Sequence, residues 1–106
     1  MNFPIQISAK DLNNRGPIET LIQERATRLE RFHHRITSAR VAITVDGPHP
    51  LRHRLKLEIA IPGSEIVVSR GPTEDLPAAI REAFDVARRQ LQDRDTHKHH
   101  HLSEKR

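Results

Sequence analysis

Arginine is the residue type in this sequence whose number and spacing point to a chemical task. The chain carries 18 Lys and Arg against 14 Asp and Glu, a formal net charge of +4 at pH 7. Arg28, Arg31 and Arg35 follow at intervals of three and four, so a helix would place them on one flank. Four more arginines follow in a second stretch: Arg81, Arg88, Arg89 and Arg94. Because guanidinium groups bind phosphates in planar, two-pronged contacts, these residues favour a polyanionic partner such as nucleic acid.

The same spacing also fits an ordinary solvated helix face. Arg25 lies near the edge of an apolar stripe, where its methylene stem can cover the core. Glu24 and Arg28 are spaced at i and i+4 as an ion pair would be. Asp85 and Asp93 interrupt the second group of arginines. At the level of spacing, a phosphate-binding surface and a mixed-charge solvated face both stay open.

The sequence contains few residues in the arrangements that catalysis usually requires. The chain has no cysteine, which excludes thiol nucleophiles and cysteine-based zinc sites. Asp11, Asp46 and His49 lie in loops without the partner spacing of an acid–base pair, and the glycines are too scattered for a phosphate-binding loop. The histidines at 97 and 99–101 form a cluster, but nothing around them suggests preformed metal geometry. We therefore expect no enzyme, no cofactor and no metal site.

Length and hydropathy limit the remaining classes. A chain of 106 residues is one domain, with little volume for a deep substrate pocket. No apolar run is long enough for a membrane span or a secretory signal, so a cytoplasmic protein with no membrane contact and no small-molecule substrate is expected. The chain has three Phe and no Tyr or Trp, so almost no aromatic side chains are available for stacking with bases. The free chain is expected to be a monomer.

The hydrophobic pattern predicts a β-α-β-β-β-α order. Apolar residues alternate with polar ones in four segments that are expected as strands: 3–9, 41–45, 54–61 and 66–70. Apolar residues recur every three or four positions in two segments that are expected as helices: Pro17 to about His33, and Asp75 to about Arg94. Gly and Pro mark turns at 46–50, 62–64 and 71–72. The apolar stripe of the first helical segment includes Phe32.

One sheet face is enough to bury both helical stripes. The predicted fold class is therefore α+β, a four-stranded sheet with two helices packed on one face. Residues 1–94 form the expected domain, and 95–106 a disordered, basic, His-rich tail. The arginine-bearing flanks of the two helices should then lie side by side and grip phosphates of structured RNA across a groove. Such contacts position a protein but carry little sequence information.

The order of elements and several short stretches resemble a known family. The stretches are Ile5–Leu12, Arg28–Phe32, the turn at 61–63, Glu74–Ile80 and Arg89–Leu91. Together they resemble the ribosome hibernation-promoting factors, also called ribosome-associated inhibitors or sigma-factor modulation proteins. The chain departs from that pattern at Pro77, where an aromatic residue is usual, and at Val86 and Asp93, where basic residues are common. It looks like a short form without the C-terminal domain of long members.

The resemblance implies a partner and a mode of action. Members bind the small ribosomal subunit in the channel of mRNA and tRNA, contact the rRNA backbone with basic helix residues, and stop translation by steric exclusion. Residues that match basic or polar positions of the family are Lys10, Arg25, Arg28, Arg31, Arg89 and Gln90. Together with the neighbouring Arg35, Arg81, Arg88 and Arg94, they form the expected RNA-binding set.

Two other binding functions fit the same residues. One is a regulatory module that docks on another protein, such as a sigma factor. The other is generic binding of double-stranded RNA, which works on any A-form duplex largely by shape. Charge reversal at Arg28 and Arg88 separates the first from RNA docking, and preference for assembled subunits separates the second.

Overall fold

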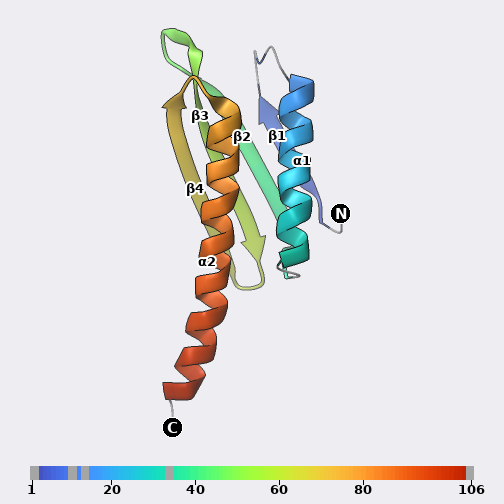
Figure 1. Cartoon of the computed structure of the whole chain (residues 1–106), viewed down its shortest axis with the longest axis vertical. Coiled ribbons are helices and arrows are strands. Elements are labelled where there is room, and N and C mark those ends of the chain that lie inside the picture. Colours follow the sequence, from blue (N-terminus) through green and yellow to red (C-terminus); the bar gives the residue numbers. More distant parts are fainter. Residues whose placement is uncertain (1–2, 10–11, 13–14, 33–34, 105–106) are drawn as a thin grey trace.

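The order of elements in the computed structural model matches the predicted β-α-β-β-β-α order (Figure 1). The structure describes residues 3–9, 12, 15–32 and 35–104, with side chains described as far as Asp93 except at 49–50. The helices are α1 (Arg15–Phe32) and α2 (Leu76–Glu104). The strands are β1 (Ile5–Ala9), β2 (Ser38–Asp46), β3 (His49–Ile61) and β4 (Ser64–Thr73).

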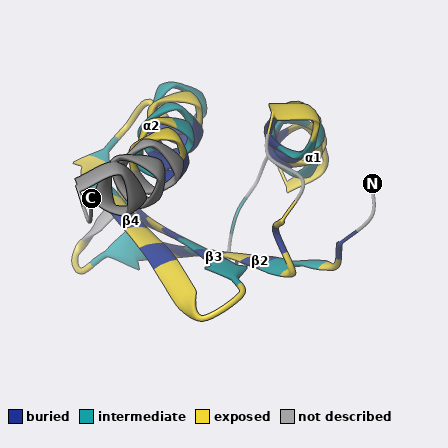
Figure 2. Cartoon of the chain, turned by 90° about the horizontal axis from the view of Figure 1, so that it is seen from below, coloured by how far each residue is buried: buried dark blue, intermediate teal, exposed yellow. Residues whose placement is uncertain are grey.

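The four strands form one mixed sheet in the order β1-β2-β3-β4. β1 and β2 are parallel, so the chain must cross over between them, and α1 is that crossover. β2, β3 and β4 are antiparallel neighbours joined by short turns, as predicted. Both helices lie on the same face of the sheet, as the view along its strands shows (Figure 2). The predicted fold class is therefore confirmed.

The core lies between that sheet face and the two helices. The inward-facing residues of the central strands, among them Val41, Leu57 and Ile59, are almost completely buried. Ile22 from α1 and Ile80 from α2 pack against the same cluster. Burying a side chain of this size stabilises the fold by about 1.5–3 kcal/mol. The alternate residues of each strand point to the opposite, solvent-facing side of the sheet, which carries mixed charges.

Local hydrogen bonds fix where each helix begins. Asp75 caps α2, because its Oδ1 accepts a hydrogen bond of 3.1 Å from the backbone N–H of Ala78. Arg15 ties the start of α1 to the sheet by donating from Nη1 to the carbonyl oxygen of Ala9, and it also pairs with Glu19. Pro17 stands in the first turn of α1, where no N–H is needed. Side chains close to the first turns thus fix where each helix begins, and at α1 one of them also contacts the sheet.

Several element boundaries differ from the prediction; β2 begins at Ser38 and β4 at Ser64, each before its predicted start. The turn predicted at 46–50 is shorter, because β3 already begins at His49. β4 continues through Gly71 and Pro72 to Thr73, since it is an edge strand and can accommodate a proline. α2 continues past the predicted end at Arg94 to Glu104, a stretch without Gly or Pro to stop a helix. Neither helix is both long and apolar enough to span a membrane, as far as the described residues go.

Candidate nucleic-acid interface

A groove between α1 and α2 gathers four of the predicted arginines. The two helices lie side by side on the sheet and touch each other (Figures 1 and 2). The groove between them has a volume of about 190 Å³. Its lining residues are Arg25, Arg28, Leu29, Arg81, Phe84, Asp85 and Arg88. Arginines from both helices therefore face one shared space, as the arrangement on one sheet face predicts.

The apolar stripes of the helices determine which arginines reach the groove. Leu29 on α1 and Phe84 on α2 are buried and form its floor. Arg25 and Arg28 are neighbours of Leu29 on α1, at i−4 and i−1. On α2, Arg81 and Arg88 are two turns apart and so project from the same side. Arg25 and Arg88 are half-buried and Arg28 and Arg81 are exposed, so the four arginines surround the buried floor of the groove.

Most of the charge in this groove is not compensated. Arg25, Arg28 and Arg81 have no ion pair with any carboxylate in the described part of the chain. The Glu24–Arg28 pair of the alternative interpretation does not form among the described residues. The lining holds four arginines and one aspartate, which gives a formal charge of +3. An uncompensated cluster of this kind attracts anions and raises their local concentration.

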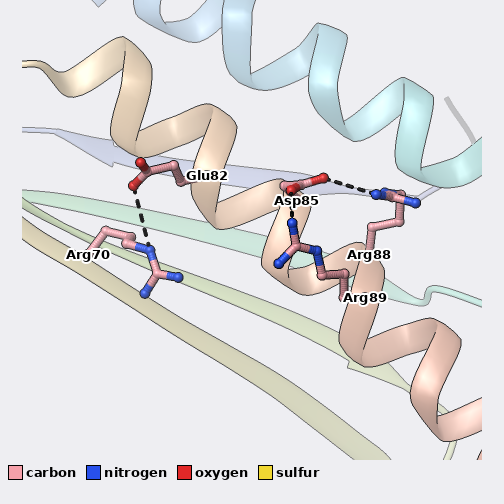
Figure 3. Close-up of polar contacts among 5 residues, drawn as sticks. All are labelled: Arg70, Glu82, Asp85, Arg88 and Arg89. Carbon is pink, nitrogen blue, oxygen red and sulfur yellow. Dashed lines mark hydrogen bonds and ion pairs between the residues drawn. The ribbon is translucent and has the colours of Figure 1, made fainter.

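Among the described residues, Asp85 is the one carboxylate that lines the groove. Its Oδ1 accepts from Arg88 at 3.1 Å and its Oδ2 from Arg89 at 2.9 Å, so it lies between the two guanidinium groups (Figure 3). The hydrogen bond from Arg88, together with the positive charges of Arg89, Arg88 and Arg25, lowers the pKa of Asp85 and outweighs desolvation. Asp85 is therefore ionised near neutral pH and holds Arg88 at the groove.

The other predicted residues lie elsewhere. Arg31 and Arg35 are exposed at and beyond the end of α1, Arg89 is exposed beside Asp85, and Gln90 is half-buried on α2. None of these four lines the groove. Lys10 and the side chain of Arg94 lie outside the described residues. The role of all ten residues in binding RNA stays a prediction.

Two features of the interface were not anticipated from the sequence. Phe32 was predicted to belong to the buried stripe, but it is 43% exposed at the last residue of α1. The Cζ atom of Arg88 lies over its ring, 5.5 Å from the ring centroid. The prediction was wrong because a stripe identifies a helix face but does not say where the opposing surface ends. One feature of the sequence could have indicated this exposure: Phe32 lies directly before the predicted end of the helix.

No metal centre is visible in the described part of the chain. No three His, Asp or Glu side chains within it come together closely enough to hold an ion. The histidine cluster at 97 and 99–101 has side chains outside the described residues, so its solvated state remains a prediction.

Comparison with known proteins places this fold and interface in context. Residues 5–99 match the family model described as Sigma 54 modulation protein / S30EA ribosomal protein. A ribosome hibernation promotion factor of Deinococcus radiodurans is 33% identical over 88 residues, which cover 81% of this chain and 46% of that protein. The chain thus spans about half the length of that relative. A ribosome hibernation promoting factor of Azotobacter vinelandii is 33% identical over 82% of this chain and 78% of its own length.

Solved structures with the same fold support the comparison. A ribosomal subunit interface protein of Coxiella burnetii has a TM-score of 0.75 at 14% identity, covering 89% of this chain and 99% of its own. The N-terminal domain of Thermus thermophilus Protein Y has a TM-score of 0.69 at 25% identity, covering 88% and 98%.

Proposed function

The chain belongs to the Sigma 54 modulation protein / S30EA ribosomal protein family, and on this premise we propose that it is a ribosome hibernation factor. It binds the small ribosomal subunit in the channel of mRNA and tRNA and inhibits translation by steric exclusion. It acts as a monomer in the cytoplasm, where ribosomes work. Family membership also confirms the expectation that the chain is not an enzyme.

The observation that carries this proposal is the groove between α1 and α2. Arg25 and Arg28 from one helix and Arg81 and Arg88 from the other line a single space, with only Asp85 to oppose them. Two cationic rims separated by a groove suit two runs of phosphates better than one extended acidic peptide. Backbone contacts of this kind fix position and register without reading bases, which suits a factor that occupies a defined place on rRNA.

Inhibition of translation requires only that the protein occupies the channel of mRNA and tRNA. The helices and sheet share one packed core, which fixes the two arginine-bearing helices relative to each other before binding, and Asp85 holds the side chain of Arg88. Such a preorganised surface loses little conformational freedom when it docks. Release of counterions from rRNA supplies the driving force, because each phosphate that meets an arginine frees bound cations. A folded domain seated in the mRNA and tRNA channel excludes both RNAs without any chemical step.

Charge reversal within the groove tests the proposal. Arg28→Glu and Arg88→Glu should each weaken binding of the purified protein to small subunits by at least about tenfold, because each removes a cation and adds a repelled anion. Arg52→Glu is the matched control. Arg52 is exposed on β3, has no ion pair among the described residues and does not line the groove. Equal affinity of all three variants would contradict the proposed surface.

Competition then tests the location. In cell-free translation, the wild-type protein should inhibit less when mRNA and initiator tRNA are bound to the small subunit first. Inhibition that is unaffected by the order of addition would place the protein outside the channel.

The same variants address the alternative of a regulator that docks on another protein. A protein partner that contacts another surface would still bind Arg28→Glu and Arg88→Glu. Loss of ribosome binding together with the loss of translation inhibition in those variants would favour the ribosome.

A further inference from the structure

Phe32 differs from the other phenylalanines of the chain in its exposure. All three lie in the described residues; Phe3 and Phe84 are 6% exposed, whereas Phe32 is 43% exposed. Single exposed apolar side chains are common and need no explanation on their own. Phe32 stands out because of the charged group beside it.

Arg88 connects this ring to the groove. Its guanidinium carbon lies 5.5 Å from the ring centroid of Phe32, and the same side chain lines the groove. Asp85 accepts a hydrogen bond from Arg88 at 3.1 Å, which holds the guanidinium in this position. The cation lies over one face of the ring, and Phe32 as a residue is still 43% exposed. Through Arg88, the groove thus adjoins an exposed aromatic ring that is backed by a cation.

This combination has a specific chemical preference. A phosphate bound by Arg88 would bring a base of the same strand close to Phe32, because Arg88 both lines the groove and lies over the ring. An unpaired base stacks on aromatic rings and guanidinium planes, and because every base has a π face, such a contact tolerates any sequence. A base inside an A-form duplex has no free face to offer. The ring therefore selects a place where a helical RNA segment meets an unpaired nucleotide.

We propose that Phe32, backed by Arg88, is a stacking site for one unpaired nucleobase beside the phosphate-binding groove. The inference rests on the proposed function in that the groove binds RNA, and it adds a base contact to backbone contacts. The sequence left almost no aromatic residues for base stacking, and the proposed site needs only one exposed ring, for one base.

Two probe RNAs test the stacking site directly. The first is a short RNA hairpin with one bulged nucleotide, and the second is the same hairpin with an abasic site at the bulge. The wild-type protein should bind the first about tenfold more tightly, because stacking one base contributes that order of affinity. The two hairpins carry the same number of phosphates, so contacts to the backbone alone give a ratio near one.

Three variants link the preference to the ring. Phe32→Leu keeps an apolar side chain but removes the π face, and it should reduce the ratio to near one. Phe32→Trp keeps a stacking surface and should retain the preference. Val67→Ala is the control, since Val67 is 44% exposed on β4 and does not line the groove. Thermal unfolding checks that all three variants fold.

The outcomes separate this inference from the proposed function. The stacking site is overturned if the wild-type protein binds both hairpins equally or not at all, or if Phe32→Leu keeps the preference. In that case, wild-type binding to small subunits that is lost in Arg28→Glu would leave the proposed function standing. A base preference that depends on Phe32, in a protein that does not bind ribosomes, would support the stacking site and contradict the proposed function.

Discussion

Asp85 sets the charge and the geometry of the groove at the scale of single residues. Its carboxylate neutralises one positive charge of the cluster and accepts hydrogen bonds from Arg88 and Arg89, which hold both side chains in position (Figure 3). Without it, both long side chains would regain rotamer freedom, which binding to phosphate would then have to remove. A carboxylate in a cationic groove is therefore consistent with a surface organised for binding, and it limits attraction to unrelated polyanions.

The lowered pKa of Asp85 gives a prediction about pH. Because its folded-state pKa lies below the usual value of 3.8, the stabilisation that its ionised form provides is fully present above pH 3.8. It is lost as the pH falls through the lower folded-state pKa. Asp85→Asn should thus be less stable than the wild type near neutral pH, and the difference should shrink in strongly acidic solution. Urea unfolding at a series of pH values measures it.

Glu24→Gln provides the control for this experiment. Glu24 is an exposed carboxylate on α1 that forms no pair with Arg28 among the described residues. Its substitution should leave the free energy of unfolding nearly unchanged across the same pH range. A stability difference between Asp85→Asn and the wild type that does not change with pH would argue against the ion-pair interpretation.

At the scale of elements, Gly71 shows how β4 passes the irregular end of β3. Its φ of +102° lies in a region that other residues rarely adopt. A Cβ placed there would come 2.5 Å from the backbone carbonyl oxygen of His53, on the neighbouring strand where the register shifts. The backbone cannot yield without breaking the strand pairing, so the position requires glycine.

Substitution of Gly71 should therefore be costly. Gly71→Ala should lower the free energy of unfolding by more than about 2 kcal/mol, from backbone strain and the clash together. Gly16→Ala is the matched control, because Gly16 lies in α1 and a Cβ there meets nothing within 4 Å. That change should stabilise the protein by about 0.5–1 kcal/mol, since alanine is the better helix former. Chemical denaturation measures both, and equal effects would refute the assignment of strain to Gly71.

A second prediction at the scale of elements concerns the central strand β3. Leu57 on β3 is fully buried in the core, and Leu57→Ala should cost about 2–5 kcal/mol because it leaves a cavity. Val67→Ala, on the solvent-facing side of β4, should change the stability by less than about 0.5 kcal/mol. A small effect at Leu57 would contradict the core described here.

These elements also show what a sequence can predict. Alternation placed Leu55, Leu57 and Ile59 on the buried face, because a strand has only two sides and a one-residue error would expose all of them. The continuation of β4 past Pro72 was missed, since the sequence does not reveal that β4 is an edge strand. The exposure of Phe32 was missed for a similar reason, because it depends on where a neighbouring helix lies.

At the scale of the whole molecule, the distribution of charge distinguishes the two sides of the sheet. On the side away from the helices, Glu58 lies near both Arg40 and Lys56, so charges of both signs alternate. The helix side instead concentrates uncompensated arginines in one groove. The spacing of arginines on each helix and the meeting of the two helix flanks on one sheet face could be predicted. Which of the arginines line the groove could not, because that depends on the distance between the two helices and on their rotation. Net charge alone would not have identified the interface.

The most direct test of the ribosome claim is co-sedimentation of the purified protein with separated ribosomal subunits over a series of salt concentrations. We predict that it pellets with the small subunit and not with the large one. With about four phosphates neutralised by the groove, the logarithm of the binding constant should fall with the logarithm of salt concentration with a slope near −3. Absence of pelleting at low salt, or equal pelleting with both subunits, would contradict the account.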